Sequence, residues 1–290
     1  MHDMESNLLM SRTFLILGGM LFITSITARL NKAYETTTEL FITIGGSLLF
    51  LFCVMFFADS YPINLIVVAI FSAFFGWSLG PTIAYIGKSF KFRKYLKSKL
   101  VLSKKIKRDH SPTFWKKFMG ANEEKRTVYY YKSEPTNFFD INSNEFKELK
   151  DEFDKNVLRH DKYNQEWQNV VFQAMVGTTL AVIMAGIIVA FVPTDFSFLG
   201  VFLLLALFTL IVCEFLNAFF FKSERTRIIY SYCGVVIFSL YLIYDFNYLE
   251  KAIAAGDDSW GTAVKVAVNL YLDIINLFID LLEILAASSD

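Results

Sequence analysis

Seven long stretches of the chain are almost entirely apolar, near residues 13–33, 38–58, 62–87, 169–192, 196–221, 227–250 and 263–287. A transmembrane helix needs about 20 predominantly apolar residues, because the hydrocarbon core of a bilayer is about 30 Å thick and a helix rises about 1.5 Å per residue. The chain is 54% hydrophobic and 17% aromatic, too apolar for an ordinary soluble domain. The pattern therefore predicts an all-α integral membrane protein, a bundle of seven transmembrane helices.

A polar stretch, residues 88–168, interrupts this pattern between the third and fourth predicted spans. It holds 20 basic and 12 acidic residues, a net charge of +8, so the rest of the chain carries −8. Ten Lys or Arg residues fall within residues 88–108, interleaved with apolar ones. Such a segment typically rests on anionic lipid headgroups, and no nucleic-acid recognition motif accompanies the charge.

The chain is thus expected to have three regions. Residues 1–87 hold helices 1–3, residues 88–168 form a small, mostly helical, extramembrane insert, and residues 169–290 hold helices 4–7. Within the insert, residues 127–132 favour a short strand, and Asn142 or Ser143 is positioned to cap a helix. The insert offers a surface for a protein partner whose identity the sequence does not give.

Three further patterns bear on the chemistry of the bundle. The acidic N-terminal segment is unlike a signal peptide, so the first helix is expected to remain. The three cysteines lie inside predicted spans without metal-ligand spacing, and no cofactor is expected. In the third span Ala73, Gly76, Gly80 and Ala84 recur at three- and four-residue spacing, which lets a neighbouring helix backbone approach closely.

Two aspartates, Asp245 and Asp273, lie well inside the last two apolar helices. An ionised Asp at the bilayer centre costs roughly 2.5–3.5 kcal/mol even on insertion scales, so such residues face the bundle interior and usually have a function. The polar connection between these helices is short, so they must return antiparallel, and the two carboxyls can lie at similar depth. Two carboxylates in a low-dielectric site do not both ionise readily, so the pair is expected to share a proton and to titrate as a unit.

The last helix carries a continuous polar face. Asn269, Asp273, Asn276, Asp280 and Glu283 follow one another at spacings of four, three, four and three residues. This face predicts a central element that lines water, and its acidic oxygens suit a hard cation such as Ca²⁺, with Asp245 and Asp273 as the candidate ligands. Glu214 in the fifth helix is a further lining candidate, although an interfacial ion pair with Lys222 explains it equally well.

These motifs resemble a known family. The sequences IFSLYLIYDFNYLEKA and NLYLDIINLF, with FFGWSLGP at residues 74–81 and FQAMVGTTLAVI at residues 172–183, resemble the transmembrane Bax inhibitor motif family, of the bacterial calcium-leak type. The resemblance covers nearly all of the apolar part and none of the insert, which is then a large extra loop between helices 3 and 4. It implies a seven-helix bundle with a central C-terminal helix, a bacterial-type plasma membrane, and a proton-sensitive calcium leak gated by the paired aspartates.

The chain departs from this family in two places. Bacterial relatives with the aspartate latch have an arginine cluster at the start of the third helix, where this chain has Asp59 and Ser60. Relatives also tend to be neutral or basic late in the last helix, where this chain has Asp280 and Glu283. If a cation assists the pair, Arg29 is the candidate, although a snorkelling role at the headgroups is the simpler interpretation.

Two alternatives to the leak stay open. Family members are also described as suppressors of cell death and as partners of membrane proteases, which makes a binding protein acting through the insert the second hypothesis. An intramembrane aspartyl protease is the third, but such enzymes place the second Asp after Gly-x-Gly and follow it with Pro-Ala-Leu. Here Leu-Tyr-Leu precedes Asp273 and no Pro-Ala-Leu follows, so no enzymatic activity is expected.

Basic residues cluster after the odd-numbered helices: Arg29, Lys32, the insert, Lys222, Arg225 and Arg227. The positive-inside rule then predicts an external N-terminus with a cytoplasmic insert and C-terminus. Family members are usually described with a cytosolic N-terminus, so the two interpretations conflict, and the charge distribution is the one followed here.

Overall fold

The computed structural model describes residues 2–107, 125–158, 161–221 and 223–288. The chain divides into two compact units, one of residues 1–86 and 169–289 and the other of residues 87–168. We call them the membrane unit and the insert unit and describe each by itself. These boundaries lie within one residue of the change in composition at residues 88 and 168.

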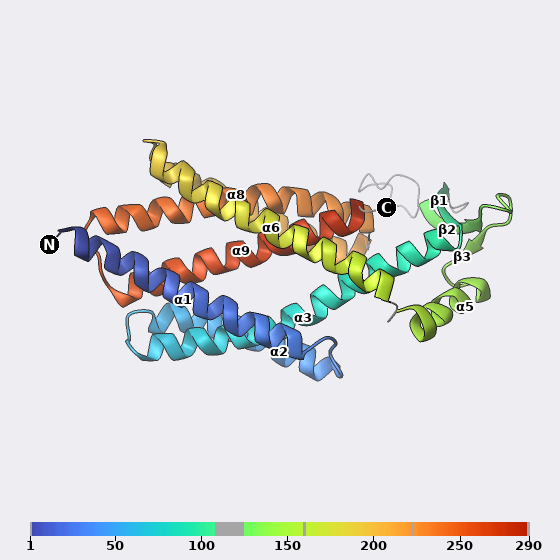
Figure 1. Ribbon diagram of the computed structural model, residues 1–290, viewed down its shortest axis with the longest axis horizontal. Helices are drawn as coiled ribbons and strands as arrows, with labels where there is room; N and C mark the ends of the chain where they lie inside the picture. Colours follow the sequence, from blue (N-terminus) through green and yellow to red (C-terminus); the bar gives the residue numbers. More distant parts are fainter. Residues whose placement is uncertain (1, 108–124, 159–160, 222, 289–290) are drawn as a thin grey trace. The chain divides into compact units, whose positions relative to one another are not determined.

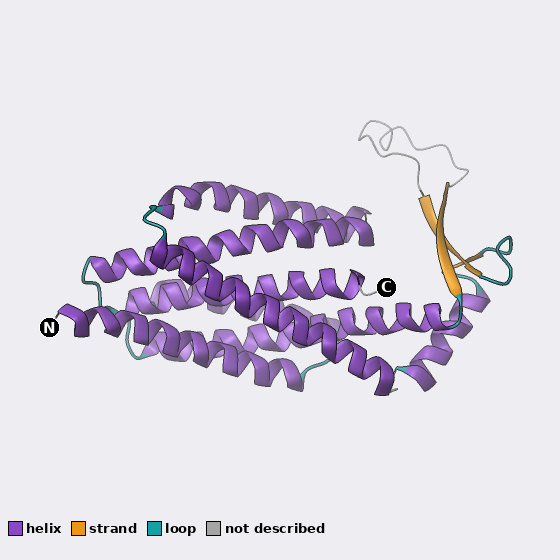
Figure 2. Cartoon of the chain, turned by 45° about the horizontal axis from the view of Figure 1, so that its top comes forward, coloured by secondary structure: helices purple, strands orange, loops and turns teal. Residues whose placement is uncertain are grey.

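The membrane unit is built from helices alone (Figures 1 and 2). Its long helices are α1 (His2–Leu30), α2 (Thr37–Phe57), α3 (Ile63–Ser98), α6 (Asp161–Phe191), α7 (Leu199–Leu216), α8 (Glu224–Ala254) and α9 (Trp260–Ser288). Two of them, α3 and α6, continue into the insert unit. The short turns η2 (Phe196–Phe198) and η3 (Asn217–Phe221) flank α7. Six of the described helices are long and apolar enough to cross a membrane. The seventh, α9, has 29 residues but carries Lys265, Asp273, Asp280 and Glu283.

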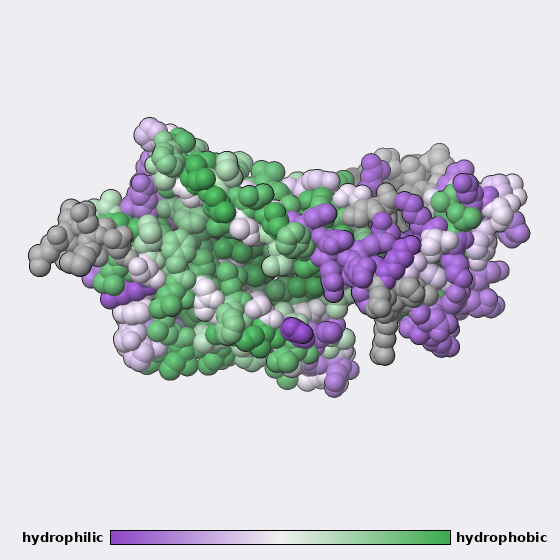
Figure 3. All heavy atoms as spheres, in the orientation of Figure 1, coloured by the Kyte–Doolittle hydropathy of each residue, from purple (hydrophilic) through white to green (hydrophobic). Residues whose placement is uncertain are grey.

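The membrane unit presents apolar side chains outward. Phe56 and Phe191 are 82% and 81% exposed, and many other large apolar side chains of this unit are similarly open. On the face drawn in Figure 3 the surface of this unit is predominantly hydrophobic. Contiguous exposed apolar surface on this scale marks contact with membrane or partner. Together with the helical spans, it confirms an all-α integral membrane protein.

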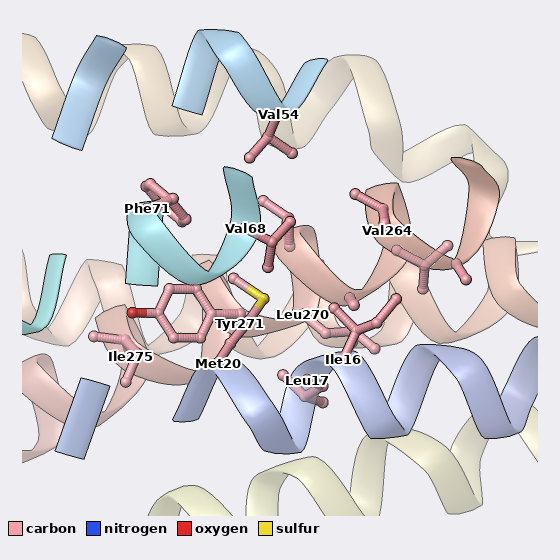
Figure 4. Close-up of a cluster of buried hydrophobic side chains, with 14 of the residues drawn as sticks. Ile16, Leu17, Met20, Val54, Val68, Phe71, Val264, Leu270, Tyr271 and Ile275 are labelled. Carbon is pink, nitrogen blue, oxygen red and sulfur yellow. The ribbon is translucent and has the colours of Figure 1, made fainter. Parts of the chain in front are cut away.

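Helix α9 is the central element of the membrane unit. It lies between α1 and α8 (Figure 1), and fourteen of its 29 residues are buried. Figure 4 shows side chains from α1, α2, α3 and α9 meeting around Tyr271. The Tyr271 ring packs edge-on against Phe71 and Phe75, and its hydroxyl lies 2.6 Å from the Thr24 hydroxyl. A tyrosine is tolerated at this depth because its hydroxyl has a partner.

Helices α1 and α3 approach each other through glycines. A Cβ added at Gly76 would lie 2.6 Å from the Thr24 carbonyl oxygen, and one added at Gly80 would overlap the carbonyl oxygens of Ala28 and Asn31. Lipid tails provide no hydrophobic driving force between helices, so close backbone packing at small residues holds them together. The structure confirms the predicted role of the small residues in the third span.

The connection between α8 and α9 makes the two helices antiparallel. Helix α8 ends at Ala254, and Gly256 follows with a φ of +75°, in the left-handed region that favours glycine. The Gly256 and Asp257 amides donate to the carbonyls of Ile253 and Ala252, which closes the helix end. The chain then enters α9 at Trp260 after a few polar residues.

An ion pair fastens the connection between α6 and α7 to α8. Lys251 Nζ lies 2.6 Å from Asp195 Oδ2, and the Ser197 amide donates to Asp195 Oδ1 over 2.9 Å. The hydrogen bond from Lys251, with support from Ser197, holds the pKa of Asp195 well below its ordinary value. Both side chains of the pair are about half exposed, so the interaction is screened by solvent.

We expect Asp195→Asn to lower the stability of the protein modestly at pH 7 and not at all in acid. A carboxyl whose pKa is lower in the folded state stabilises the fold above its unfolded pKa, near 3.9, and this contribution is lost as pH falls through the folded-state pKa. Thermal unfolding in detergent at several pH values measures the difference. Lys251→Met should reproduce it at pH 7, and the double variant should be no worse than either single one.

The insert unit combines the end of α3, a small sheet and two further helical segments. The strands β1 (Val101–Lys107), β2 (Lys125–Tyr131) and β3 (Phe139–Asp140) form an antiparallel sheet in the order β1-β2-β3, drawn orange in Figure 2. Helix α5 (Asn144–Glu152) follows, capped by Ser143, whose hydroxyl accepts from the Phe146 amide. A π-turn, η1 (Phe153–Val157), precedes α6.

The described insert unit thus contains helical segments, at the end of α3, in α5 and η1 and at the start of α6, together with a sheet. The predicted strand at residues 127–132 is present as part of β2, but it belongs to a three-stranded sheet whose first strand lies in the basic segment. The sheet and α5 share a core of aromatic and aliphatic side chains: Tyr95, Leu96, Val101, Phe139, Phe146, Leu149 and Phe153. Two ion pairs, Lys88 with Asp154 and Lys99 with Glu152, tie the end of α3 to this part of the unit.

Candidate functional site

The two predicted aspartates meet between α8 and α9. Asp245 and Asp273 are only 3% and 6% exposed, and their carboxyl groups are within hydrogen-bonding reach of each other. The Asn269 side chain, one turn before Asp273 on α9, also reaches the Asp245 carboxyl. The antiparallel return of the chain and the helical period bring these three side chains to one level.

A hydrogen bond between two carboxyl groups requires a proton on one of them. The second oxygen of each carboxyl, Oδ2, is buried and has no hydrogen-bond partner among the described residues. Leaving polar oxygens unpaired in a dry site costs free energy, and ionising both carboxyls would cost more. The contact between the two carboxyls is thus favourable with one shared proton and unfavourable with none.

A second group of charged side chains lies towards the other end of the same helix pair. Ser231 Oγ donates to Glu283 Oε2 over 3.0 Å, and Arg227 Nε lies 3.3 Å from the same oxygen. Asp280, 8% exposed, also bonds to Ser231, and its carboxyl packs so closely on Gly234 that no side chain fits there. Glu214 on α7 is within electrostatic range of Asp280 and Glu283.

The predicted polar face of α9 is therefore divided between two sites. Asn269 and Asp273 belong to the first, and Asp280 and Glu283 belong to the second. Asn276 is half-buried and lies between them along the helix. Glu214 joins the second group by charge, while its alternative partner Lys222 lies outside the described residues. That these side chains line an ion path stays a prediction.

The proposed role of Arg29 as the partner cation is wrong. Its side chain is exposed in the last turn of α1, and no ion pair of the described residues joins it to a carboxylate. Arginine at a helix end extends to the headgroups, which is the simpler interpretation that the sequence allowed. A basic residue that does face an acidic group of α9 is Arg227, at the start of α8, which lies beside Glu283. Sequence reasoning used it only to assign orientation.

Asp245 and Asp273 bring two carboxyl groups to one point, whereas Ca²⁺ takes roughly six to eight oxygen ligands. Within the described ranges, no three His, Cys, Asp or Glu side chains are grouped so as to hold a metal ion. A calcium ion bound at the pair stays a prediction. Calcium as a permeant ion is a separate question, because a transported ion needs only weak and successive contacts.

Fold and site together define a class: a multi-pass helical membrane protein whose last two helices are joined by a buried carboxyl pair. Comparison with known proteins is consistent with this class. Residues 162–290 match the family model described as "Inhibitor of apoptosis-promoting Bax1". Over these residues the chain is similar to the Bax inhibitor family, and the matched region includes both carboxyl sites.

Three relatives illustrate the extent of the similarity. Protein LIFEGUARD 4 of Arabidopsis thaliana is 35% identical over 122 residues, covering 41% of this chain and 47% of the relative. LIFEGUARD 2 of the same plant is 39% identical over 93 residues, covering 32% and 37%. The Golgi anti-apoptotic protein of vaccinia virus (strain Lister) is 35% identical over 121 residues, covering 42% and 48%. The chain thus spans about half the length of these curated relatives or less.

Proposed function

We propose that this protein is a pH-sensitive cation leak, with Ca²⁺ as its substrate, and that Asp245 and Asp273 form its gate. With one shared proton the two carboxyls hold α8 against α9. When the last proton leaves, two carboxylates face each other in a dry site and repel, so the helices separate. The polar face of α9 then becomes open to water and to cations.

The observation that carries this proposal is the buried contact between the Asp245 and Asp273 carboxyls, with one unpartnered oxygen on each. A purely structural pair would be expected to satisfy these oxygens, because an unmade buried hydrogen bond costs about 1–3 kcal/mol. A switch gains from leaving them unpaired. The contact is then only marginally favourable, and the loss of one proton can reverse it.

The test is reconstitution into liposomes that contain a calcium-sensitive dye. Calcium entry should exceed that of protein-free liposomes and should rise with pH across the titration of the pair. A second cation of similar size and lower charge, such as Na⁺, reports whether the path selects by charge. Calcium entry equal to that of empty liposomes at every pH would remove the leak from consideration.

A second candidate is an interaction protein that acts against cell death. The similarity to the family model supports it, as does the name of the vaccinia relative as an anti-apoptotic protein. The insert unit adds a specific observation, because it is compact, has its own aromatic core and sits outside the region matched by the family model apart from its last residues. On this view the aspartates stabilise the bundle, and partner capture through the insert unit occurs without calcium flux.

A further inference from the structure

The second charged site joins three helices around one guanidinium. Arg227 belongs to the first turn of α8, Asp280 and Glu283 to the last turns of α9, and Glu214 to the end of α7. Arg227 lies 3.3 Å from Glu283, and its guanidinium also lies 5.9 Å from the Tyr85 ring of α3. Glu283 is thus paired with Arg227, while Asp280 and Glu214 lie within electrostatic range of Glu283.

The contact between Arg227 and Glu283 is built to be releasable. Arg227 Nε makes no hydrogen bond of good geometry to a described residue, so the contact is an ion pair only. The Arg227 side chain is 34% exposed, whereas Glu283 is 14% exposed. The acidic partner is therefore fixed in the bundle while the basic one reaches in from the edge. The Tyr85 ring offers the guanidinium a second interaction, a cation–π contact.

The site also lies on the same polar face of α9 as the gate. Asp280 is seven residues beyond Asp273, about 10 Å along the helix. A cation that passed the aspartate pair and followed this face would next meet Asp280 and Glu283. Those carboxylates would attract it, since each interacts with a unit charge 4 Å away by about 1 kcal/mol even in bulk water. Arg227 already stands there with the same sign of charge as the cation.

We propose that Arg227 is a tethered counter-cation that occupies the acidic end of the α9 face and competes with the permeant cation for Asp280 and Glu283. This inference rests on the proposed leak for its effect on transport, but not for its effect on cation binding. The guanidinium keeps its charge at all physiological pH values, so this brake acts independently of the aspartate pair. Of the other ionisable groups, Tyr85 lies beside the guanidinium, Glu214 lies within electrostatic range of Glu283, and Tyr230 lies within range of Glu214, Cys213 and Cys233.

The first arm of the test measures transport in calcium-dye liposomes. Arg227→Gln should raise calcium entry by up to about thirtyfold over the wild-type protein at the same pH, the factor that corresponds to removing the repulsion between one unit charge and divalent Ca²⁺ about 4 Å apart in bulk water. Arg225→Gln is the matched control, because Arg225 is an exposed arginine two residues earlier on the same helix. It removes the same charge from the surface and should leave entry unchanged.

The second arm measures cation binding without transport. Thermal unfolding of the detergent-solubilised protein is followed with CaCl₂ and with NaCl at equal ionic strength. Arg227→Gln leaves the carboxylates without their counter-cation, so Ca²⁺ should raise its Tm, while the wild-type protein and Arg225→Gln should respond little. The double variant Arg227→Gln with Glu283→Gln should lose the Ca²⁺ response.

The two arms separate this inference from the proposed function. If no protein shows calcium entry but Arg227→Gln gains the Ca²⁺ response, the leak fails and the counter-cation role stands. If the wild-type protein leaks, and Arg227→Gln neither leaks faster nor gains the response, the counter-cation role is overturned. The charge swap Arg227→Glu with Glu283→Arg guards against misfolding. The swapped protein should have the wild-type Tm. If its Tm is lower and Arg227→Gln shows no rise in Tm with Ca²⁺, the counter-cation role is also overturned.

Discussion

Asp273→Asn is expected to hold calcium entry at its low value across the whole pH range. The amide that replaces the carboxyl donates a hydrogen bond to Asp245 and cannot be deprotonated, so it imitates the pair with its shared proton. Entry through the wild-type protein should change by up to about tenfold per pH unit where the last proton leaves. In the variant, the ratio between high and low pH should fall to about one, measured with calcium-dye liposomes at matched protein density.

The control for this variant is Asp258→Asn. Asp258 is an exposed aspartate in the connection between α8 and α9, and its backbone carbonyl, not its carboxyl, accepts from Arg12. This substitution removes the same charge beside the same two helices and should keep the wild-type pH dependence. Asp245→Asn should behave like Asp273→Asn, because either amide can replace the proton. A wild-type pH response in both pair variants would show that the gate is elsewhere.

The pairing of Asp245 with Asp273 could be predicted because it depends on few quantities. A short polar connection forces two adjacent helices to be antiparallel, and the residue count from that connection then sets the depth of each side chain. The same reasoning failed for Arg29. Depth along α1 does not say which way a long side chain at a helix end points, and Arg29 is exposed to the outside.

The sheet of the insert unit was not visible in the local pattern. In the sequence of β1, Lys104, Lys105 and Lys107 resemble a solvated basic segment, and among the β1 side chains that the structure describes only Val101, at its start, is buried. Its partner β2 begins eighteen residues after β1 ends, and pairing across that separation leaves no periodic signal. The strand of residues 127–132 was found because its three consecutive tyrosines favour strands by themselves.

Only the α9 residues of the second charged site could be predicted from the sequence. The spacing on the last helix identifies Asp280 and Glu283, but the sequence pattern does not identify Arg227 and Ser231, in the sixth predicted span, as partners of Glu283. Counting residues along the two antiparallel helices could have indicated which part of α8 faces Asp280 and Glu283. Because α8 and α9 run antiparallel, and Asp245 lies opposite Asp273, residues seven positions beyond Asp273 must lie opposite those about seven before Asp245. Gly234, which meets Asp280, lies one turn beyond that level, and Ser231 lies three residues further.

Gly76→Ala and Gly80→Ala should each destabilise the protein by about 1–3 kcal/mol, the usual cost of inserting atoms into a packed interface. The added Cβ of either residue would meet backbone atoms of α1, which cannot rotate away as a side chain can.

Gly45→Ala is the matched control, because nothing lies within 4 Å of the position of its added Cβ. There the better helix propensity of Ala, about 1 kcal/mol relative to Gly, should leave stability unchanged or raised. Thermal unfolding in the same detergent measures all three variants. The substitution of Gly by Ala should lower the Tm at Gly76 and Gly80 and should leave it unchanged or raise it at Gly45. Equal losses at all three positions would mean that the glycines serve the backbone of their own helices. A loss confined to Gly76 and Gly80 would mean that α1 and α3 are held together by backbone contact, the support against which α9 and its carboxyl pair are packed.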